Sequence, residues 1–278
     1  MDQKLTGRKR VLYLLFVAVF LFVMVSPMLY MISASFMQES DLNHIPPRIL
    51  PSAGTIKNYV AAFVQQPLLR YVFNSFVITI IAVVICITAG CMASYALTRT
   101  NIRFKTVFLL FVLTISLLPT ITLINPIFKM YSKLGLLNTH IGLALIVSVL
   151  DLPMTIWFLT AVFKGIPVSF EESAKLDGAN MFQMFFYIIL PLLKASIFSI
   201  SILVFIGAWN RFLLSQVLNQ YEQYRTVVVG LTLYQTTHTI PFGVVAAAGM
   251  ITVLPLMAMV LVFQKNILGG IMEGGVKE

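Results

Sequence analysis

Long apolar runs separated by short polar segments dominate the pattern of this sequence. Six of these runs are long enough to cross the hydrocarbon core of a bilayer, which takes about 20 mainly apolar residues in a helix. None of them alternates polar with apolar positions, as the shorter strands of a membrane barrel do. The pattern predicts spanning helices over Val11–Ser33, Val72–Thr98, Thr106–Phe128, Ile141–Phe163, Ala195–Leu218 and Gly243–Gln264.

Composition agrees with an integral membrane protein and excludes a soluble globular domain. Apolar residues make up 59% of the 278 positions and charged residues 10%, against about 45–50% and about 25% in soluble domains. The first apolar run follows Lys9 and Arg10, as the apolar part of a signal peptide would, but it is too long for one and no clean cleavage site closes it. We therefore predict a retained signal-anchor helix.

The basic residues are distributed unequally between the two sets of loops. Twelve Lys and Arg residues fall on one side of the predicted spans and six on the other. The richer side is expected to be cytoplasmic, which places both termini inside, with residues 1–10 as a cytoplasmic N-terminus and 265–278 as a cytoplasmic tail. The net charge of +9 does not indicate nucleic-acid binding, because the basic residues lie at the ends of apolar runs and form no patch.

Small and turn-forming residues add detail to the predicted spans and loops. Gly90 and Ser94 are four residues apart, which permits close packing of the second span against a neighbouring helix. Cys86 and Cys91 lie inside the same apolar run, with no cluster of further ligands, and are interpreted as small buried residues. The stretch after the first span is rich in proline, but residues 56–66 predict a short amphipathic helix, with Tyr59, Ala62 and Phe63 on one face.

The cytoplasmic segment from Lys164 to Lys194 is too polar to span and yet has the features of a folded element. Ser169 and Glu172 form a capping-box pattern, and Glu171 and Lys175 are spaced to pair along a helix. Gly178 then permits the chain to leave the helix. Two interpretations remain open on these residues: a capped surface helix, or a helix that docks in a groove of a cytoplasmic partner. Acid–base chemistry is disfavoured, because no nucleophile or metal-ligand set accompanies the glutamates.

The same segment resembles the EAA loop of ABC importer permeases. The stretch Glu172-Ser-Ala-Lys-Leu-Asp-Gly178, nine residues and then Ile188-Ile-Leu-Pro191 match that motif, with Ser173 in place of its second-position alanine. The resemblance covers nearly the whole chain and is closest to the smaller permease of maltose-type importers. It is also carried by Asn74-Ser75, Ala93-Ser-Tyr-Ala-Leu-Thr-Arg99, Leu137-Asn-Thr139, Ala208-Trp-Asn-Arg-Phe212 and the tail from Phe263-Gln-Lys265 to Gly274-Gly-Val-Lys277.

This resemblance implies an all-α permease of about six transmembrane helices in the inner membrane, with residues 11–278 as one membrane domain that includes the coupling loop 164–194. It also implies a second permease, two ATPase subunits, an external solute-binding protein and a carbohydrate substrate. ATP and Mg²⁺ would be bound by the ATPase, since this chain has no phosphate-binding loop motif. No catalytic residue, cofactor or metal site is expected here. The expected ATPase-coupling residues are Glu171, Glu172, Ser173, Ala174, Lys175, Asp177 and Gly178.

Charged residues inside predicted spans are costly and often mark transport pathways. Asp151 and Arg211 fall at similar depth, so they either pair with each other or bond separately to other polar groups. Trp209 could line a substrate pathway, or it could pack against other side chains or anchor its span at the membrane interface. The candidates for a substrate pathway are Asn125, Asp151, Trp209, Asn210, Arg211 and Gln216.

Two other function classes are compatible with a six-span protein. An ion-coupled secondary carrier is expected to show inverted repeats and broken helices around buried acidic groups, and this sequence shows one central acidic residue and no repeat. A membrane protein that serves assembly and transports nothing is the other alternative. Binding to an ATPase subunit and ATP-dependent uptake distinguish the importer from both.

Overall fold

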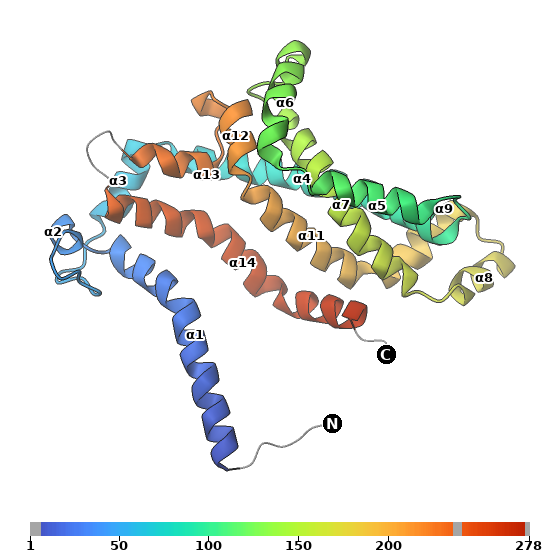
Figure 1. Ribbon diagram of the computed structural model, residues 1–278, viewed down its shortest axis with the longest axis horizontal. Helices are drawn as coiled ribbons and strands as arrows, with labels where there is room; N and C mark the ends of the chain where they lie inside the picture. The colour runs from blue at the N-terminus through green and yellow to red at the C-terminus, as the bar shows by residue number, and fades with distance from the viewer. Residues whose placement is uncertain (1–6, 236–240, 276–278) are drawn as a thin grey trace. The chain divides into compact units, whose positions relative to one another are not determined.

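The computed structural model describes residues 7–235 and 241–275, and its described part is helical with no strand (Figure 1). The first six residues of the predicted N-terminal segment and the last three of the predicted tail lie outside the described residues. The helices are α1 (Arg8–Ser35), α2 (Glu39–Leu42), α3 (Lys57–Gln65), α4 (Leu68–Arg99), α5 (Lys105–Ser116), α6 (Thr120–Leu134), α7 (His140–Lys164), α8 (Ser169–Leu176), α9 (Met181–Gln183), a π-helix (Met184–Ile189), α10 (Leu190–Leu192), α11 (Lys194–Trp209), α12 (Phe212–Leu218), α13 (Val227–Gly230) and α14 (Phe242–Gly275), with 3-10 turns at Glu222–Tyr224 and Leu231–Tyr234.

Within residues 7–235 and 241–275, four helices are long and apolar enough to cross a membrane alone: α1, α4, α7 and the first part of α14. Two further helix pairs meet the same criterion only when taken together. They are α5 with α6, bent by 89°, and Met181–Leu192 with α11, bent by 77°. Counting each bent pair as one span gives six, the number that the apolar runs predict. The second pair starts at Met181, inside the segment predicted to be cytoplasmic, and ends at Trp209, so its bounds differ from the predicted Ala195–Leu218. Helix α14 continues past the predicted end at Gln264.

The predicted span over Thr106–Phe128 is divided in its middle into two helices. Helix α5 ends at Ser116 and α6 begins at Thr120. Pro119 lies at the break, with φ −60° and ψ 120°. The helix is interrupted there because proline lacks a backbone N–H donor and disfavours the helical conformation of the residue before it. The apolar run continues across the break, so hydropathy alone does not reveal it.

The predicted span over Ala195–Leu218 is also interrupted. Helix α11 ends at Trp209, and α12 starts at Phe212. Arg211 leaves the helical region, with ψ 78°, next to Asn210, a residue type that favours turns. The break therefore places a charged side chain at a point where the backbone is not helical.

The chain divides into two compact units, residues 1–68 with 231–253 and residues 69–230 with 254–278. In the second unit α7 is the central helix, and it packs against both α5 and α11 (Figure 1). Cys86 and Cys91 are buried and free of disulfides, which confirms their interpretation as small core residues. One cluster of the core is formed by Ile78, Ala82, Ile127, Tyr131, Leu143, Ala144, Ile146, Val147, Ala208, Leu214 and Leu218.

The close packing predicted for Gly90 and Ser94 is confirmed, and the neighbouring helix is α7. A Cβ atom on Gly90 would lie 2.9 Å from Leu159 Cδ1 and 3.1 Å from Thr155 Cγ2. The buried Ser94 hydroxyl donates to the Ile156 carbonyl at 3.1 Å and accepts from Thr160 at 3.2 Å. Small residues thus let the two backbones approach closely, as is typical of helix pairs in membranes.

Replacing Gly90 with leucine is expected to separate α4 from α7. Overpacking of a filled contact commonly costs about 1–3 kcal/mol, so the detergent-solubilised protein should unfold at a lower temperature. Val84→Leu is the matched control, because Val84 lies on the same helix and is exposed. Equal unfolding temperatures for the two variants would show that the Gly90 contact is unimportant.

The predicted amphipathic helix over 56–66 is confirmed as α3. Ala62 is fully buried, and its carbonyl accepts a hydrogen bond from the Tyr234 hydroxyl at 2.5 Å. Tyr59 is half-buried and stays on the packed face. Phe63 was expected on this face but is 43% exposed.

Candidate functional site

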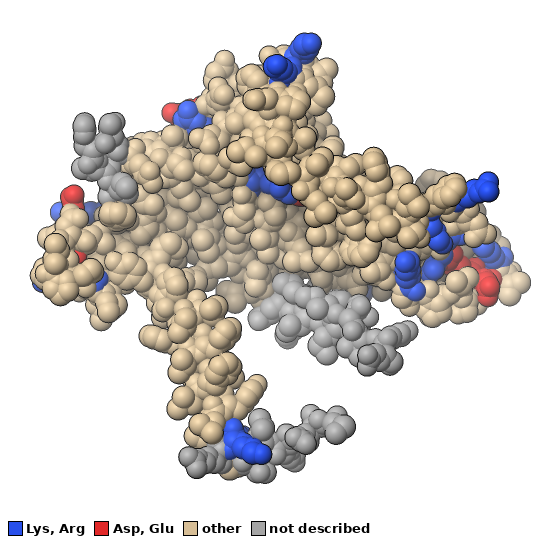
Figure 2. Space-filling view, in the orientation of Figure 1, with Lys and Arg blue, Asp and Glu red and all other residues tan. Residues whose placement is uncertain are grey.

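Helix α8 is a short polar helix at one end of the second unit, just after the long helix α7. In Figure 2, positive and negative side chains gather at the end of this unit that carries α8 and α9. Two residues of the helix, Glu171 and Ala174, face inward and are buried. The remaining predicted coupling residues, Glu172, Ser173, Lys175, Asp177 and Gly178, are exposed. The helix therefore presents a polar face outward and holds a single carboxylate inside.

The start of α8 differs from the predicted capping box. Ser169 is the first helical residue, the N-cap is Val168, and no side chain caps this end. A capping box forms instead at Asn180 and Gln183, where each side-chain oxygen accepts from the other residue's backbone amide at 2.9 Å. Gly178 has φ +81°, a conformation that favours glycine, so the prediction of a helix end there is confirmed.

Glu171 forms an ion pair with Arg99, the last residue of α4. The two side chains are only 6% and 10% exposed, and the Arg99 guanidinium also donates to the Ile166 carbonyl at 2.9 Å. This contact corrects one expectation. Glu171 pairs across the fold with Arg99 and not along the helix with Lys175, and its carboxylate is turned into the fold.

Aromatic packing surrounds the ion pair and completes the join between α4, α7 and the π-helix. The ring of Tyr95 lies 5.0 Å from that of Phe185 and 6.1 Å from that of Phe163, centre to centre. Tyr95, Phe163, Ile166 and Phe185 belong to one buried cluster. This cluster packs α4, α7 and the π-helix together, and the Arg99–Glu171 ion pair ties α8 to the end of α4 beside it.

Large apolar side chains are exposed beside the polar face of α8. Leu176 at its end is 90% exposed, and Phe182 and Tyr187 are also largely exposed. Contiguous exposed apolar groups rimmed by charged ones mark interaction sites. The segment from α8 to the π-helix thus combines exposed charge, exposed apolar groups and a rigid base.

A second set of predicted site residues meets inside the membrane spans. Asp151 of α7 and Arg211 at the break after α11 form an ion pair, which confirms the pairing hypothesis. Within the described part of the chain, Asp151 Oδ2 and Arg211 Nε are buried with no hydrogen-bond partner. Asp151 also lines a cavity of about 120 Å³ between α7 and α11, together with Met154, Thr155, Phe158, Ile200, Leu203, Val204 and Gly207.

The other pathway candidates are placed differently. Trp209 is buried and its ring stacks on that of Phe205 at 5.6 Å, which agrees with its packing interpretation; its place in a substrate pathway stays a prediction. Asn210 is exposed, with its amide donating to the Ile206 carbonyl. Asn125 on α6 and Gln216 on α12 are exposed, and the two helices pack against each other.

Arg99 is a residue of this candidate site that the sequence reasoning missed. Its position at the end of an apolar run was interpreted only as a topology signal. Arg99 ends one span and Glu171 lies in the first turn of a loop helix, so their charges could pair. Because 72 residues separate them, the spacing along the sequence does not predict the contact. Among the described residues, no group of three or more His, Cys, Asp or Glu could hold a metal ion.

Comparison with known proteins identifies relatives over nearly the full chain. Residues 86–271 match the family described as the inner membrane component of binding-protein-dependent transport systems. The sulfoquinovosyl glycerol transport system permease protein SmoH of Agrobacterium fabrum is 33% identical, over 90% of this chain and 88% of its own length. The trehalose/maltose transport system permease protein MalG of Thermococcus litoralis is 33% identical over 97% of each chain.

A solved structure has the same fold. It belongs to a bacterial ABC transporter involved in the import of the acidic polysaccharide alginate. The match has a TM-score of 0.78 and covers 94% of this chain and 98% of the other, with 22% sequence identity. The likeness shows that the two chains share a fold.

Proposed function

Because the chain belongs to the family of inner membrane components of binding-protein-dependent transport systems, we propose that it is the permease subunit of an ATP-driven carbohydrate importer. In this proposal it forms half of the translocation pathway, and a separate ATPase docks on the segment from α8 to the π-helix. The observation that carries the proposal is the buried Arg99–Glu171 ion pair beneath the exposed face of α8.

The coupling residues divide into two groups by their burial. Glu172, Ser173, Lys175 and Asp177 are exposed and provide the polar contacts to the ATPase, and Gly178 turns the chain after them. Glu171 and Ala174 are buried and hold α8 against the bundle. Movement of the ATPase then displaces α8 and the ends of α4 and α7 together, because packed elements shift as rigid bodies between discrete arrangements.

The partners follow from the same proposal. A second permease supplies the other half of the pathway, two ATPase subunits bind ATP and Mg²⁺, and an external solute-binding protein delivers the substrate. Both termini and α8 face the cytoplasm, in agreement with the excess of basic residues on that side. A carbohydrate substrate is supported by relatives whose names specify trehalose, maltose and sulfoquinovosyl glycerol.

The polar groups in the spans are the proposed contribution of this chain to the pathway. The free carboxylate oxygen of Asp151 is an acceptor and the Arg211 Nε–H a donor, which suits sugar hydroxyls. Asn210 follows α11, Asn125 lies on α6 and Gln216 on α12. All three are exposed amides that offer both donors and acceptors.

Replacing Glu172 with alanine, or Gly178 with valine, is expected to impair ATPase binding and uptake while leaving membrane insertion intact. The first change removes an exposed charge from the docking face. The second forces a side chain into a left-handed conformation, which costs about 1–2 kcal/mol and redirects the chain after α8. Co-purification of the ATPase and ATP-dependent uptake are the measurements.

Glu222→Ala is the control for these variants, since Glu222 is an exposed glutamate in a loop far along the chain. It should bind the ATPase and transport as the unmodified protein does. Normal binding and uptake in both the Glu172 and Gly178 variants would contradict docking through α8.

A further inference from the structure

The loop that follows α1 is organised around one buried carboxylate. Asp41 is 1% exposed, and it accepts hydrogen bonds from Arg48 Nη1 at 2.6 Å, the Ser52 hydroxyl at 2.7 Å and the Ser52 amide at 3.0 Å. The Ser52 hydroxyl and amide, with the Arg48 guanidinium, lower the pKa of Asp41 from its ordinary value. The carboxylate is therefore charged at neutral pH, and it closes the loop between residues 41 and 52.

Hydrogen bonds also tie this loop to the end of α1. The Ser33 hydroxyl donates to the Ile49 carbonyl at 2.6 Å, and the Thr55 amide donates to the Phe36 carbonyl at 2.9 Å. Asn58 donates to the carbonyls of Ser35 and Met37 at 3.0 and 2.8 Å. The loop is therefore held at a fixed height along the α1 axis.

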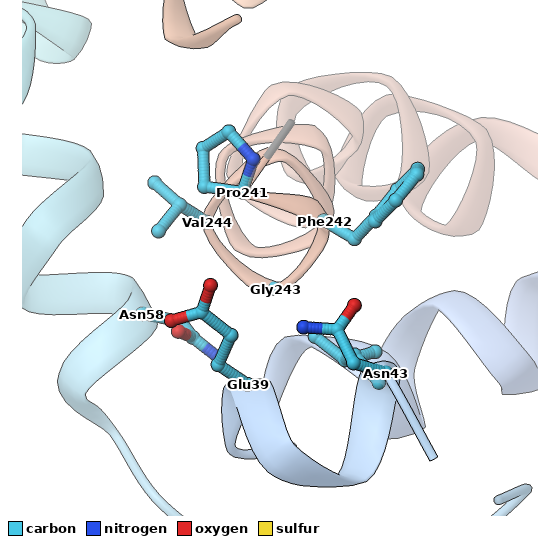
Figure 3. A pocket seen from close by; sticks show the side chains of 8 residues that line it. Glu39, Asn43, Asn58, Pro241, Phe242, Gly243 and Val244 are labelled. Carbon is cyan, nitrogen blue, oxygen red and sulfur yellow. The ribbon is translucent and has the colours of Figure 1, made fainter. Parts of the chain in front are cut away.

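The start of α14 packs against Asn58 of α3. A Cβ atom on Gly243 would lie 2.5 Å from Asn58 Nδ2, so only glycine allows the helix to approach the asparagine. Figure 3 shows Gly243 facing Asn58, with the carboxylate of Glu39 and the amide of Asn43 beside them. The end of α1, α3 and the start of α14 thus support the loop on a packed base.

The loop displays three aliphatic side chains on its surface. Ile45 is 92% exposed, Ile49 73% and Leu50 72%. Burying one such side chain contributes about 1.5–3 kcal/mol. A loop that is closed around the buried Asp41 carboxylate and still leaves three aliphatic side chains exposed is therefore suited to contact with an apolar phase. Arg48 lies between Ile45 and Ile49 in the sequence, and its side chain is bent back to Asp41.

The length of α1 sets the depth of these side chains. At 1.5 Å per residue, Ser33 lies about 35 Å along the axis from Arg10, and the hydrocarbon core is about 30 Å thick. With the basic residues Lys9 and Arg10 in one headgroup layer, Ser33 and its partner Ile49 reach the boundary between hydrocarbon and headgroups on the other side. The apolar side chains of α1 are themselves largely exposed along this length, so the three aliphatic side chains of the loop extend an apolar surface.

We propose that the loop from Ile45 to Leu50 is an interfacial anchor, whose Ile45, Ile49 and Leu50 side chains insert into the lipid boundary at the C-terminal end of α1. The occupant of this surface is the bilayer itself and not a soluble partner. The anchor holds the end of α1 and α3 at a constant depth while other parts of the permease move.

Site-specific fluorescence in lipid vesicles tests the depth directly. The native Cys86 and Cys91 are buried, so a cysteine at Ile49→Cys can be labelled selectively with an environment-sensitive dye in the full chain. We expect the dye to be quenched strongly by lipids that carry a spin label near the headgroup and several-fold less by aqueous iodide. Leu50→Cys should behave in the same way.

Gly54→Cys is the control on the same loop, because a side chain there meets open space and lies beyond the end of α1. It should be quenched by iodide and little by the lipids. Adding Asp41→Asn to Ile49→Cys should open the loop and reduce the quenching by lipid.

Quenching of the Ile49 label by iodide to the same extent as the Gly54 label, with no effect of the lipids, would overturn the proposal. Protection from both quenchers that arises only when the solute-binding protein is added would also overturn it, and would assign the surface to that protein.

Discussion

Glu171→Ala is expected to abolish ATP-driven uptake, although the Glu171 carboxylate is turned into the fold. The substitution leaves the Arg99 guanidinium buried without its counter-charge. Removal of one partner from a buried ion pair commonly costs about 3–5 kcal/mol. Helix α8 then loses its ion pair with α4, so the ATPase still displaces α8 but the displacement does not move α4 and α7.

Three variants separate this linkage from a general loss of folding. Glu171→Gln keeps the shape of the side chain and should fold, retain the ATPase on purification and lose most uptake. Arg99→Gln should behave in the same way. The exchanged pair, Arg99→Glu with Glu171→Arg, should recover part of the uptake that each single exchange loses.

Distances between spin labels on α8 and α4 provide a structural readout. Label positions at the exposed Ser173 and the half-buried Thr98 are suitable. The unmodified chain should show a narrow distance distribution and Glu171→Gln a broader one. A narrow distribution together with normal uptake in Glu171→Gln would contradict a mechanical role for the pair.

Neutralising Asp151 or Arg211 singly is the second change with a large expected effect. Each single variant leaves a charge without its partner between α7 and the break after α11. An unpaired charge near the middle of a spanning helix costs about 2.5–3.5 kcal/mol on insertion scales. Asp151→Ala and Arg211→Ala should therefore both reduce the amount of folded protein in the membrane and the rate of uptake.

The double variant Asp151→Asn with Arg211→Gln distinguishes the two roles of this pair. Removing both charges should restore the unfolding temperature toward that of the unmodified protein, because no unpaired charge remains. Uptake should stay low if the pair also binds substrate hydroxyls. Equal stability of the single and double variants would contradict the pairing, and full uptake in the double variant would remove these residues from the pathway.

The apolar runs predict the spans well because a bilayer demands about 20 apolar residues from every spanning helix. The same property hides the breaks at Pro119 and Arg211, since an apolar run has the same hydropathy whether the helix is straight or bent by 89°. Gly90 and Ser94 were predictable as a packing site, because small residues four apart lie on one helix face. Their partner α7 was not, because nothing in the local sequence specifies it.

In the coupling segment, too, the local backbone features were predictable and the contacts with distant residues were not. The turn at Gly178 was predictable, because glycine alone adopts its backbone conformation without strain. Ser169 was predicted to be the N-cap of a capping box. It is instead the first residue of the helix, and Val168 is the N-cap. Glu171 was predicted to pair with Lys175 at helical spacing, and a buried arginine from another span competes more strongly for the carboxylate because it is desolvated there.

ATP-dependent uptake in reconstituted vesicles tests the central proposal most directly. The chain and its second permease are incorporated into vesicles with the solute-binding protein outside and loaded with carbohydrate, and the ATPase subunits and ATP are either supplied or withheld. We predict accumulation of the carbohydrate only when both the ATPase and hydrolysable ATP are present, and none with Glu172→Ala. Accumulation driven by an ion gradient in vesicles that lack the ATPase would contradict the account and would make the protein a secondary carrier.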